Sequence, residues 1–584
     1  MLVCGQGFKP CRIEAQPHPL GSIPNPVFHD SHLVTALPWV EDRMTLISTD
    51  TLVTLPAPAA RRTPAQNRRR ILCLFPRYTH SFGTLDHAFP LAGVKAFMPP
   101  QGLLVIAAYL PAEWDVRFID ENVRRASDAD FRWADAVFIS GMHVQRQHIL
   151  EINRRAQALG KVTILGGPSV SGCPEWYPEI DLLHVGELGD ATDRLIERLD
   201  RSTERPSRQE VYTTAERLPL DRFPTPAYEQ LRLRDYFLGS IQFSSGCPYR
   251  CEFCDIPELY GRNPRLKSVE QVIRELDAIV AQHGVGAVYF VDDNFIGNRK
   301  AALELLRGLV KWQQEHGYPL EFACEATLNL AQAPEALELM REAGFGTVFC
   351  GIETPEEDAL QAIQKKQNLR QPILEAVQTI NGYGLEVVSG IILGLDTDTA
   401  DTGDRVCAFV EASAIPMLTI NLLHALPRTP LWRRLAEEGR LLTDPNRDSN
   451  VEFRLPYDTV VAMWRRCITR VYDPAAVFAR FEVQCRQTYP HRKPITRQVG
   501  WPMIVRGLRM LARVLWHGGV RADYRRTFWR MALPRLRHGE IEEVIHIGLI
   551  AHHLIMFARE CAGGGGERSF YAPTGVEEQR ASSG

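Results

Sequence analysis

The 584-residue sequence has little net charge and no long apolar run. Its formal net charge is −3, so the charge of the whole chain gives no reason to expect a nucleic-acid partner. No apolar stretch approaches the ~20 residues that a membrane-spanning helix needs, and the first residues lack the long apolar core of a signal peptide. These absences favour a cytoplasmic protein that binds no nucleic acid.

Clustered cysteines are also scarce. Of the 13 cysteines, ten are scattered singly along the chain, which argues against a disulfide framework in a protein of this size. No G-x-G-x-x-G turn follows the first apolar strand, so the sequence lacks the usual fingerprint of a dinucleotide-binding domain. The one cluster consists of Cys247, Cys251 and Cys254 in "SSGCPYRCEFC".

Apolar strand-like runs alternate with helical segments in two blocks, so we expect an α/β protein. The first block contains "RILCLFP", "DVRFID", "ADAVFIS", "KVTILGG" and "DLLHVGE", and it predicts a doubly wound, Rossmann-like parallel sheet. The second block has six strand candidates, from "SIQFSS" to "MLTINLLHAL", and predicts a partial (β/α)6 barrel. The expected parts are a disordered extension at 1–69, the doubly wound domain at 70–200, a linker at 201–235, the barrel at 236–440, a helical domain at 441–562 and a disordered tail at 563–584.

The cysteine triplet lies in the loop after the first predicted barrel strand, at the mouth where β/α barrels place their chemistry. Three thiolates complete only three corners of a tetrahedral zinc site, and the nearest downstream histidine, His283, falls within a predicted helix. A [4Fe–4S] cluster normally takes four cysteines, so three leave one iron with an open position. We interpret the triplet as a cluster site, with zinc or a chance grouping of thiols as the alternative.

With C-x3-C-x2-C in this position, the chain resembles the radical S-adenosylmethionine (radical SAM) enzymes. The resemblance implies that Cys247, Cys251 and Cys254 hold a [4Fe–4S] cluster whose open iron is chelated by S-adenosylmethionine (SAM). It also implies a 5′-deoxyadenosyl radical, and reduced flavodoxin or ferredoxin as the electron donor. The SAM contacts that it implies are Phe253, Glu353 in "GIET", and Gly390, Ile392 and Gly394 in "GIILG".

Polar side chains also follow the second and third predicted barrel strands. "VDDNF" supplies Asp292, Asp293 and Asn294, and "CEAT" supplies Glu325. Side chains at the carboxyl ends of these strands point into the barrel, so we expect them to be ligand contacts. The alternative is capping of the next helix, above all for Asn294.

In the first block, "ILGGPSVSG" and "VGELGD" resemble the cobalamin-binding domain that precedes many radical SAM barrels. Glycine lets the backbone approach a planar macrocycle at the carboxyl ends of the strands. Some cobalamin-binding domains supply a histidine ligand to cobalt from a D-x-H-x-x-G motif, which this chain lacks. His143 is present in "SGMHVQ", but the residues around it do not match that motif. We therefore expect water or nothing at the lower cobalt position. The implied cobalamin contacts are Gly166, Gly167, Pro168, Ser169, Gly186 and Glu187.

Together, the two resemblances imply a cobalamin-dependent radical SAM methyltransferase that methylates an unactivated carbon. One alternative is an enzyme of this class that contracts or closes a ring without methylating, and another is a non-catalytic cobalamin or redox sensor. Residues 76–111 are similar to the hopanoid C-2 methylases, which implies a polycyclic, lipid-like substrate.

The segment 501–537 carries nine arginines and one aspartate, with Trp, Phe, Met and Leu between them. Such a basic amphipathic pattern is typical of helices that lie on a membrane surface. The alternative is an arginine-rich helical cap that packs on the barrel. The sequence leaves open whether the protein associates peripherally with the inner face of the membrane.

Overall fold

The computed structural model describes residues 65–443, 447–493 and 501–563, without the side chains of 501–503. These residues all belong to one contact-defined unit, Ala57–Gly584. The predicted extension at 1–69 lies outside the described residues except for 65–69, where the backbone N–H groups of Gln66 and Asn67 donate to Asp200. The predicted tail at 563–584 lies outside them except for residue 563.

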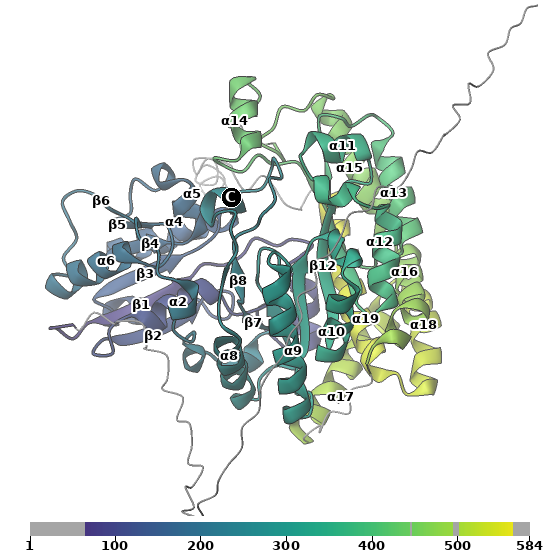
Figure 1. Ribbon diagram of the computed structural model, residues 1–584, viewed down its shortest axis with the longest axis horizontal. Coiled ribbons are helices and arrows are strands. Elements are labelled where there is room, and N and C mark those ends of the chain that lie inside the picture. The colour runs from purple at the N-terminus through teal and green to yellow at the C-terminus, as the bar shows by residue number, and fades with distance from the viewer. Residues whose placement is uncertain (1–64, 444–446, 494–500, 564–584) are drawn as a thin grey trace, which may run out of the picture. The chain divides into compact units, whose positions relative to one another are not determined.

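The first block folds into a six-stranded parallel sheet in the order β2-β1-β3-β4-β5-β6 (Figure 1). Helices connect the strands, so the central strands are covered on both faces, and five of the six β1 residues are buried. The order β2-β1-β3 reverses direction beside β1, which is where open α/β sheets bind ligands. The strands are β1 (Arg70–Phe75), β2 (Asp115–Asp120), β3 (Ala136–Ser140), β4 (Val162–Gly166), β5 (Leu182–Val185) and β6 (Glu210–Thr213), and the main helices are α2 (Gln101–Tyr109), α3 (Asp128–Trp133), α4 (Arg146–Ala158) and α6 (Asp190–Arg201).

The sixth strand, β6, lies inside the segment 201–235 that we predicted to be a linker. It pairs with β5 at the edge of the sheet, from Leu182 opposite Glu210 to Val185 opposite Thr213. Its sequence, "EVYT", has too few apolar residues to stand out, because an edge strand is only half covered. The first sheet therefore has one strand more than the sequence indicated.

The second block forms a six-stranded parallel sheet in the sequential order β7 to β14, as predicted. Among the described residues β7 and β14 pair with only one neighbour each, so the barrel is partial. Figure 1 shows α9, α10 and α12 along its outer side. The elements are β7 (Gly239–Ile241), α8 (Val269–Ala281), β10 (Ala287–Phe290), α9 (Arg299–His316), β11 (Glu321–Ala326), α10 (Pro334–Ala343), β12 (Phe345–Glu353), α11 (Glu357–Ala362), α12 (Ile373–Gly382), β13 (Glu386–Leu393), α13 (Thr402–Ser413) and β14 (Leu418–Leu422).

The two faces of this sheet differ. On β11, buried residues such as Phe322 and Cys324 alternate with half-buried ones such as Ala323 and Glu325. The buried side faces the surrounding helices, where Phe290, Phe322 and Phe345 pack ring against ring. The half-buried side therefore faces the interior of the barrel, which is the space available to ligands.

A short antiparallel pair, β8 (Ser244–Ser245) with β9 (Arg265–Leu266), follows β7. Residues 246–264 form the loop that connects these two strands, and it includes the short helix α7 (Ile256–Leu259). All three clustered cysteines lie on this loop.

Helices make up the rest of the described chain, as the sequence predicts. They are α14 (Pro430–Glu437), α15 (Tyr457–Val471), α16 (Pro474–Gln487), α17 (Trp501–Trp516), α18 (Arg525–His538) and α19 (Ile541–Ala562), with a π-helical turn at His517–Arg521. Within the described part of the chain, α19 alone is long and apolar enough to cross a membrane. Since 61% of its most apolar window is buried inside the protein, α19 packs as a core helix.

The loop after β1 joins the first domain to these helices. Phe82 is buried between Tyr472, which directly follows α15, and Phe557 of α19, with ring centroids 4.7 Å from each. The backbone N–H of His87 donates to Nδ1 of His553, and Nε2 of His553 lies 3.2 Å from the Phe82 carbonyl oxygen. This loop therefore ties the carboxyl edge of the first sheet to the centre of the helical domain.

Candidate active site

The cysteine loop is anchored at its base by backbone contacts. The N–H of Cys247 donates to the carbonyl oxygen of Gly261 at 3.2 Å. Gly246 has a φ of 100°, and a Cβ at this position would lie 2.9 Å from the same oxygen. Only glycine fits here, because any side chain would push the two ends of the loop apart.

Asp292 and Asp293 hold the chain that leads into this loop. The Asp292 carboxylate accepts hydrogen bonds from the N–H groups of Phe243 and Ser244, and the Asp293 carboxylate accepts one from Gly246 at 2.7 Å. Burial raises the pKa of Asp292 to about 7 and that of Asp293 to about 6. Both carboxylates thus bind protein backbone, a structural role that the sequence analysis did not predict.

Asn294 does not cap the next helix, so that alternative is wrong. The N-cap of α9 is Asn298, whose side chain accepts from the N–H of Ala301 at 3.2 Å. Asn294 is buried, and its amide has no hydrogen-bond partner of ordinary geometry among the described residues. Burial raises the pKa of the Cys247 thiol, and a contact from the Asn294 side chain partly offsets that shift. An unsatisfied buried amide beside a cysteine is a group that a ligand would satisfy.

Glu353 ends β12 with a φ of 67°, which is unusual for a side chain of its size. Its carboxylate forms a buried ion pair with Lys365, Nζ to Oε1 at 2.5 Å. Two glycines make room for it: a Cβ on Gly351 would lie 2.6 Å from Lys365 Nζ, and one on Gly390 would lie 3.9 Å from Glu353 Oε2. The sequence predicted Glu353 and Gly390 but not Lys365.

Lys365 also faces the cysteine loop. Its ammonium lies 5.6 Å from the ring centroid of Phe253. Burial lowers the pKa of Lys365, but Glu353 and the thiols of Cys251 and Cys254 outweigh burial and raise it. Two residues further along, Gln367 Nε2 lies 3.4 Å from Cys251 Sγ. The segment after α11 therefore directs a positive charge and an N–H donor at the cysteines.

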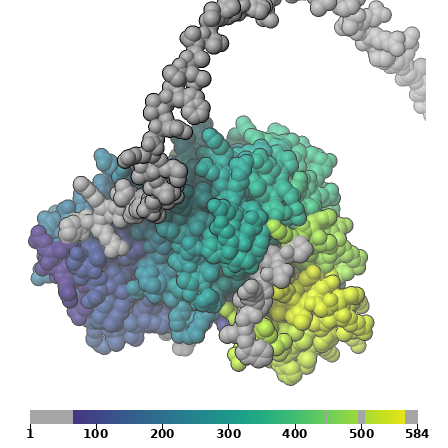
Figure 2. Space-filling view, turned by 60° about the horizontal axis from the view of Figure 1, so that its bottom comes forward, coloured from purple at the N-terminus to yellow at the C-terminus, as the bar shows by residue number. Residues whose placement is uncertain are grey.

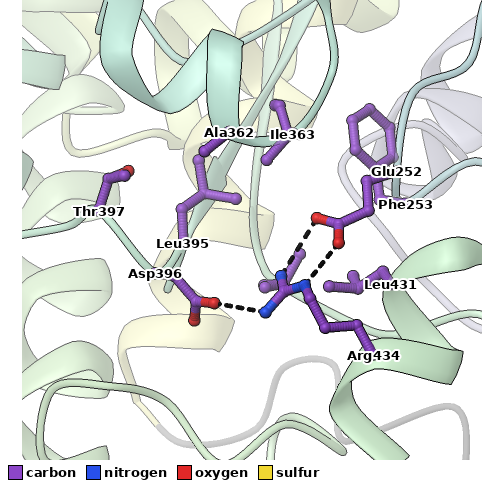
Figure 3. Close-up of a pocket in the computed structure, with 10 residues that line it drawn as sticks. Glu252, Phe253, Ala362, Ile363, Leu395, Asp396, Thr397, Leu431 and Arg434 are labelled. Carbon is purple, nitrogen blue, oxygen red and sulfur yellow. Dashed lines mark hydrogen bonds and ion pairs between the residues drawn. The ribbon is translucent and has the colours of Figure 1, made fainter.

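Phe253 lines a cavity of about 340 Å³ beside the loop (Figure 3). Apolar side chains form most of its wall, and Arg434 of α14 crosses it to pair with Glu252 at 2.6 Å and with Asp396 at 2.8 Å. Apolar walls with a few polar groups suit a flat ligand that needs orientation. The lining residues are Glu252, Phe253, Ala362, Ile363, Leu395, Asp396, Thr397, Leu423, Leu431 and Arg434.

The cavity is lined by Leu395, Asp396 and Thr397, which follow the "GIILG" segment of β13, and Gly394 at the end of that segment is used differently from our expectation. Gly394 has a φ of 95°, and a Cβ there would lie 2.5 Å from the ring of Phe453. The flat ring that this glycine approaches is therefore a side chain of the protein. Ile392 is half-buried on the same strand, and the Gly394 N–H donates to Asp398 at 2.7 Å.

Glu325 faces the barrel interior from β11, as predicted. The Tyr289 hydroxyl of β10 donates to its carboxylate at 3.4 Å. Burial raises the pKa of Glu325 to about 7, and the nearby Asp293 charge adds to the shift. The barrel interior thus contains a carboxyl group that gains or loses its proton near neutral pH.

In the first domain, the turn after β4 folds back onto the turn after β3. Gly167 has a φ of 95°, and a Cβ there would lie 2.6 Å from Ser140 Oγ. Gly166 ends β4 and Pro168 begins the short helix Pro168–Gly172. Ser169 is buried, and its hydroxyl bonds to Nδ1 of His143 at 3.1 Å and to the Tyr177 hydroxyl.

His143 is packed within these turns. Its ring lies edge-on to Trp176, with centroids 5.3 Å apart, and burial lowers its pKa to about 4. Its Nε2 would be 3.1 Å from a Cβ on Gly172. The imidazole is therefore enclosed by the turns, and the absence of a histidine ligand on cobalt stays a prediction.

Gly186 and Glu187 lie in the turn after β5. Gly186 has a φ of 104°, and its N–H donates to Ser171 Oγ at 2.9 Å. The Glu187 carboxylate pairs with Arg265 of β9 at 2.6 Å and with Arg217 at 2.9 Å. Arg265 lies at the base of the cysteine loop. The Glu187–Arg265 ion pair therefore links the turn after β5 in the first domain to the cysteine loop of the barrel.

Comparisons with known proteins agree with this architecture. Residues 89–196 match the family model "B12 binding domain", residues 241–410 match "Radical SAM superfamily", and residues 429–565 match "Domain of unknown function (DUF4070)". The hopanoid C-2 methylase of Rhodopseudomonas palustris (strain TIE-1) is 59% identical over 510 residues, 87% of this chain and 97% of that protein. The chain belongs to the cobalamin-binding radical SAM methyltransferases.

Further relatives of this radical SAM methyltransferase share its sequence or its fold. An uncharacterized methyltransferase of Synechocystis sp. is 36% identical, over 83% of this chain and 90% of that protein. The structure of the cobalamin-dependent SAM radical enzyme OxsB with aqua-cobalamin bound has a TM-score of 0.55 at 16% identity, over 84% of this chain and 80% of that one. The predicted fold class, cofactors and carbon methylation are confirmed: the enzyme uses a [4Fe–4S] cluster, SAM and cobalamin.

The cysteine loop fits the cluster of this radical SAM methyltransferase. The radical SAM family match argues against zinc, and among the described residues no group of three or more His, Cys, Asp or Glu side chains is arranged to hold a single metal ion. A cluster instead takes one thiolate per iron, so its ligands stand apart. Burial raises the pKa of Cys247 and Cys254, and the neighbouring thiols add to both shifts, so the three sulfur atoms lie within electrostatic reach of one another.

The carboxyl edge of the first sheet fits part of a corrin. A cavity of about 150 Å³ opens after β1 and β2. Beside it, the buried atoms Arg77 Nε and Glu121 Oε2 have no hydrogen-bond partner in the described part of the chain, although other atoms of these two side chains pair with Glu151 and Arg155. The polar side chains of a corrin ring would satisfy such groups. The sequence analysis missed these residues because neither belongs to a glycine turn. The lining residues are Arg77, Tyr78, His80, Thr84, Asp86, Phe89, Lys95, Ala96, Phe97, Glu121 and Asn122.

Proposed function

We propose that this enzyme methylates a carbon of a hopanoid or a similar polycyclic lipid. The observation that carries the proposal is the 59% identity to hopanoid C-2 methylase across 97% of that protein's length. The similarity extends over 87% of this chain, and so includes both cofactor domains and the helical region that follows them. The enzyme is proposed to act in the cytoplasm with reduced flavodoxin or ferredoxin as its electron donor.

The cysteine loop has the residues to hold the radical-generating group. Cys247, Cys251 and Cys254 would bind the cluster, and Asp292 and Asp293 would keep the loop in place through its backbone. When bound, the cluster with SAM supplies the 5′-deoxyadenosyl radical, and cobalamin supplies the methyl group. The protein contributes binding, orientation and the exclusion of water.

The Glu353–Lys365 ion pair is the proposed site for the charged end of SAM. The amino and carboxylate groups of SAM carry the two charges that Glu353 and Lys365 complement, and both side chains are buried beside the cysteines. The adenine would lie in the cavity bordered by Phe253, with Ile392 and Gly394 on the adjoining strand.

The glycine turns of the first sheet are the proposed cobalamin contacts. Gly166 ends β4, and Gly167 and Gly186 let the turns after β4 and β5 fold tightly against their neighbours, at the carboxyl edge of the strands where a macrocycle would lie. Pro168 and Ser169 would act with them by fixing the turn. Glu187 would contribute by holding this edge against the cysteine loop through Arg265.

The test is to express the chain in a hopanoid-producing bacterium that lacks its own C-2 methylase. Mass spectrometry of its lipids should show hopanoids that are one CH2 unit heavier. A Cys251→Ala variant serves as the control and should leave the hopanoids unchanged. Unmodified hopanoids in cells that contain active enzyme, as judged by SAM cleavage in the extract, would contradict the proposed substrate.

A further inference from the structure

Large apolar side chains are exposed mainly on the C-terminal helices. Eight such side chains are exposed among the described residues, and only Met142 and Val211 lie elsewhere. Figure 2 shows the surface of these helices, in green and yellow, beside the barrel. The six exposed side chains on them are Ile504, Leu508, Trp516, Val520, Leu533 and Ile541.

Four of the six form a line along α17 and the π-helical turn that follows it. Ile504, Leu508, Trp516 and Val520 are spaced by four or eight residues, and the exposed Ala512 fills the gap between them. Side chains four residues apart are neighbours on a helix surface, so together they make a continuous ridge. We call these four residues the apolar ridge.

The ridge is not the face by which α17 packs on the protein. That inner face carries Val514, which is buried against α19. The π-helical turn is likewise fixed from inside, since Cβ atoms on Gly518 and Gly519 would lie 2.8 Å from Phe528 and Trp529. The apolar side that α17 buries is sufficient to pack it on the protein. A second apolar side that is exposed to water therefore indicates an interaction surface.

Exposed charge around the ridge is mostly positive. Arg509, Arg521 and Arg525 are exposed next to it, and the nearby Asp523 is paired with Arg559 at 2.9 Å. Not every arginine of the segment is available. Arg506 donates to the Gly284 carbonyl oxygen at 2.9 Å, and the Arg513 guanidinium packs against Gly93. The cap alternative therefore holds for Arg506, while Arg509 and Arg513 are exposed to solvent.

We propose that the apolar ridge is a docking surface for an anionic lipid bilayer. It combines aliphatic side chains, a tryptophan and flanking arginines, which is the composition of helices that lie in the plane of a membrane interface. The complementary partner is negatively charged and apolar beneath its surface, as an anionic leaflet is. The inference agrees with a lipid substrate but rests on the surface of α17 alone.

The test is partition of the full-length holoenzyme onto vesicles of phosphatidylcholine with or without phosphatidylglycerol, measured by flotation. Combining Leu508→Glu, Trp516→Glu and Val520→Glu should weaken partition onto the anionic vesicles by about tenfold or more, because apolar contact is lost and like charge is added. The matched control is Val211→Glu on β6, which is 53% exposed like Val520 and should partition like the wild type.

Arg509→Gln tests the charged component. It should weaken partition by about fivefold on phosphatidylglycerol vesicles, leave partition onto pure phosphatidylcholine unchanged, and lose its effect at high salt. The vesicles contain no hopanoid, so the result does not depend on the proposed substrate. Circular dichroism and SAM cleavage establish that each variant is folded, and Leu508→Gln with Trp516→Gln provides a milder pair.

Unchanged partition of a folded glutamate or glutamine variant would overturn the proposal. So would a wild-type dimer in size-exclusion chromatography that the ridge substitutions convert to monomer without affecting partition, since the ridge would then bind a second copy of the chain.

Discussion

In the barrel, buried charges act together with glycine conformation to hold the functional turns, whereas in the first sheet the turns after β4 and β5 depend mainly on glycine conformation. Asp292 and Asp293 accept the N–H groups that lead into the cysteine loop, and Glu353 is paired with Lys365. The turns after β4 and β5 depend instead on Gly167 and Gly186, whose φ angles are 95° and 104°. The two regions should therefore fail in different ways: the barrel when a charge loses its partner, the first sheet when a Cβ is added.

The largest effect that separates the regions is expected at Lys365. Lys365→Met leaves the Glu353 carboxylate buried without a partner, which should lower the free energy of unfolding by about 3–5 kcal/mol. Urea unfolding measures this. Lys366→Gln, at the exposed neighbouring lysine, is the control and should change little. Adding Glu353→Leu to Lys365→Met should restore stability, and a single variant as stable as wild type would break the comparison.

A smaller effect is expected at Gly167. Gly167→Ala forces a side chain into a backbone conformation that favours glycine and places a Cβ 2.6 Å from Ser140 Oγ, which should cost about 1–3 kcal/mol. Cobalamin titration should also show weaker binding. Gly160→Ala is the control, because its φ is also positive, at 70°, but no atom lies within 4 Å of its Cβ. Equal losses in both variants would show that contact with Ser140 is unimportant.

A pH-dependent effect is expected at Glu325. Burial raises its pKa from 4.5 to about 7, so the folded protein binds this proton more tightly than the unfolded chain does. The contribution of Glu325 to stability is therefore complete below pH 4.5 and is lost as the pH rises through about 7. Glu325→Gln should remove this fall, which is at most about 1.4 kcal/mol per pH unit.

Unfolding free energies of wild type and variant between pH 5 and pH 8 measure the difference for Glu325. Glu315→Gln, at an exposed residue of α9, is the control and should leave the pH profile as it is. A wild-type profile that is already flat would contradict the raised pKa.

Elements with a strong local pattern were predictable from the sequence. The six barrel strands and five strands of the first sheet are apolar runs of the right length. The cysteine spacing, together with its place after a strand, predicts the cluster loop. β6 was missed because an edge strand such as "EVYT" is half exposed and has no continuous apolar run.

Site residues that come together only through the tertiary fold could not be predicted from the sequence. Lys365 lies in "QKKQN", which looks like a polar surface turn, and only the fold buries it beside Glu353. Arg434 reaches Glu252 from 182 residues further along the chain. Asp292 and Asp293 were correctly placed at the mouth of β10, but their backbone partners on another strand were not visible in the sequence.

The most direct test of the account is the iron and cobalt content per chain of anaerobically purified wild type, Cys251→Ala and Gly167→Val, measured on the same samples. The account predicts about four irons and one cobalt in wild type, loss of iron with cobalt retained in Cys251→Ala, and loss of cobalt with iron retained in Gly167→Val. Four irons in Cys251→Ala, or full cobalt in Gly167→Val, would contradict the assignment of the cluster to the cysteine loop or of cobalamin to the glycine turns.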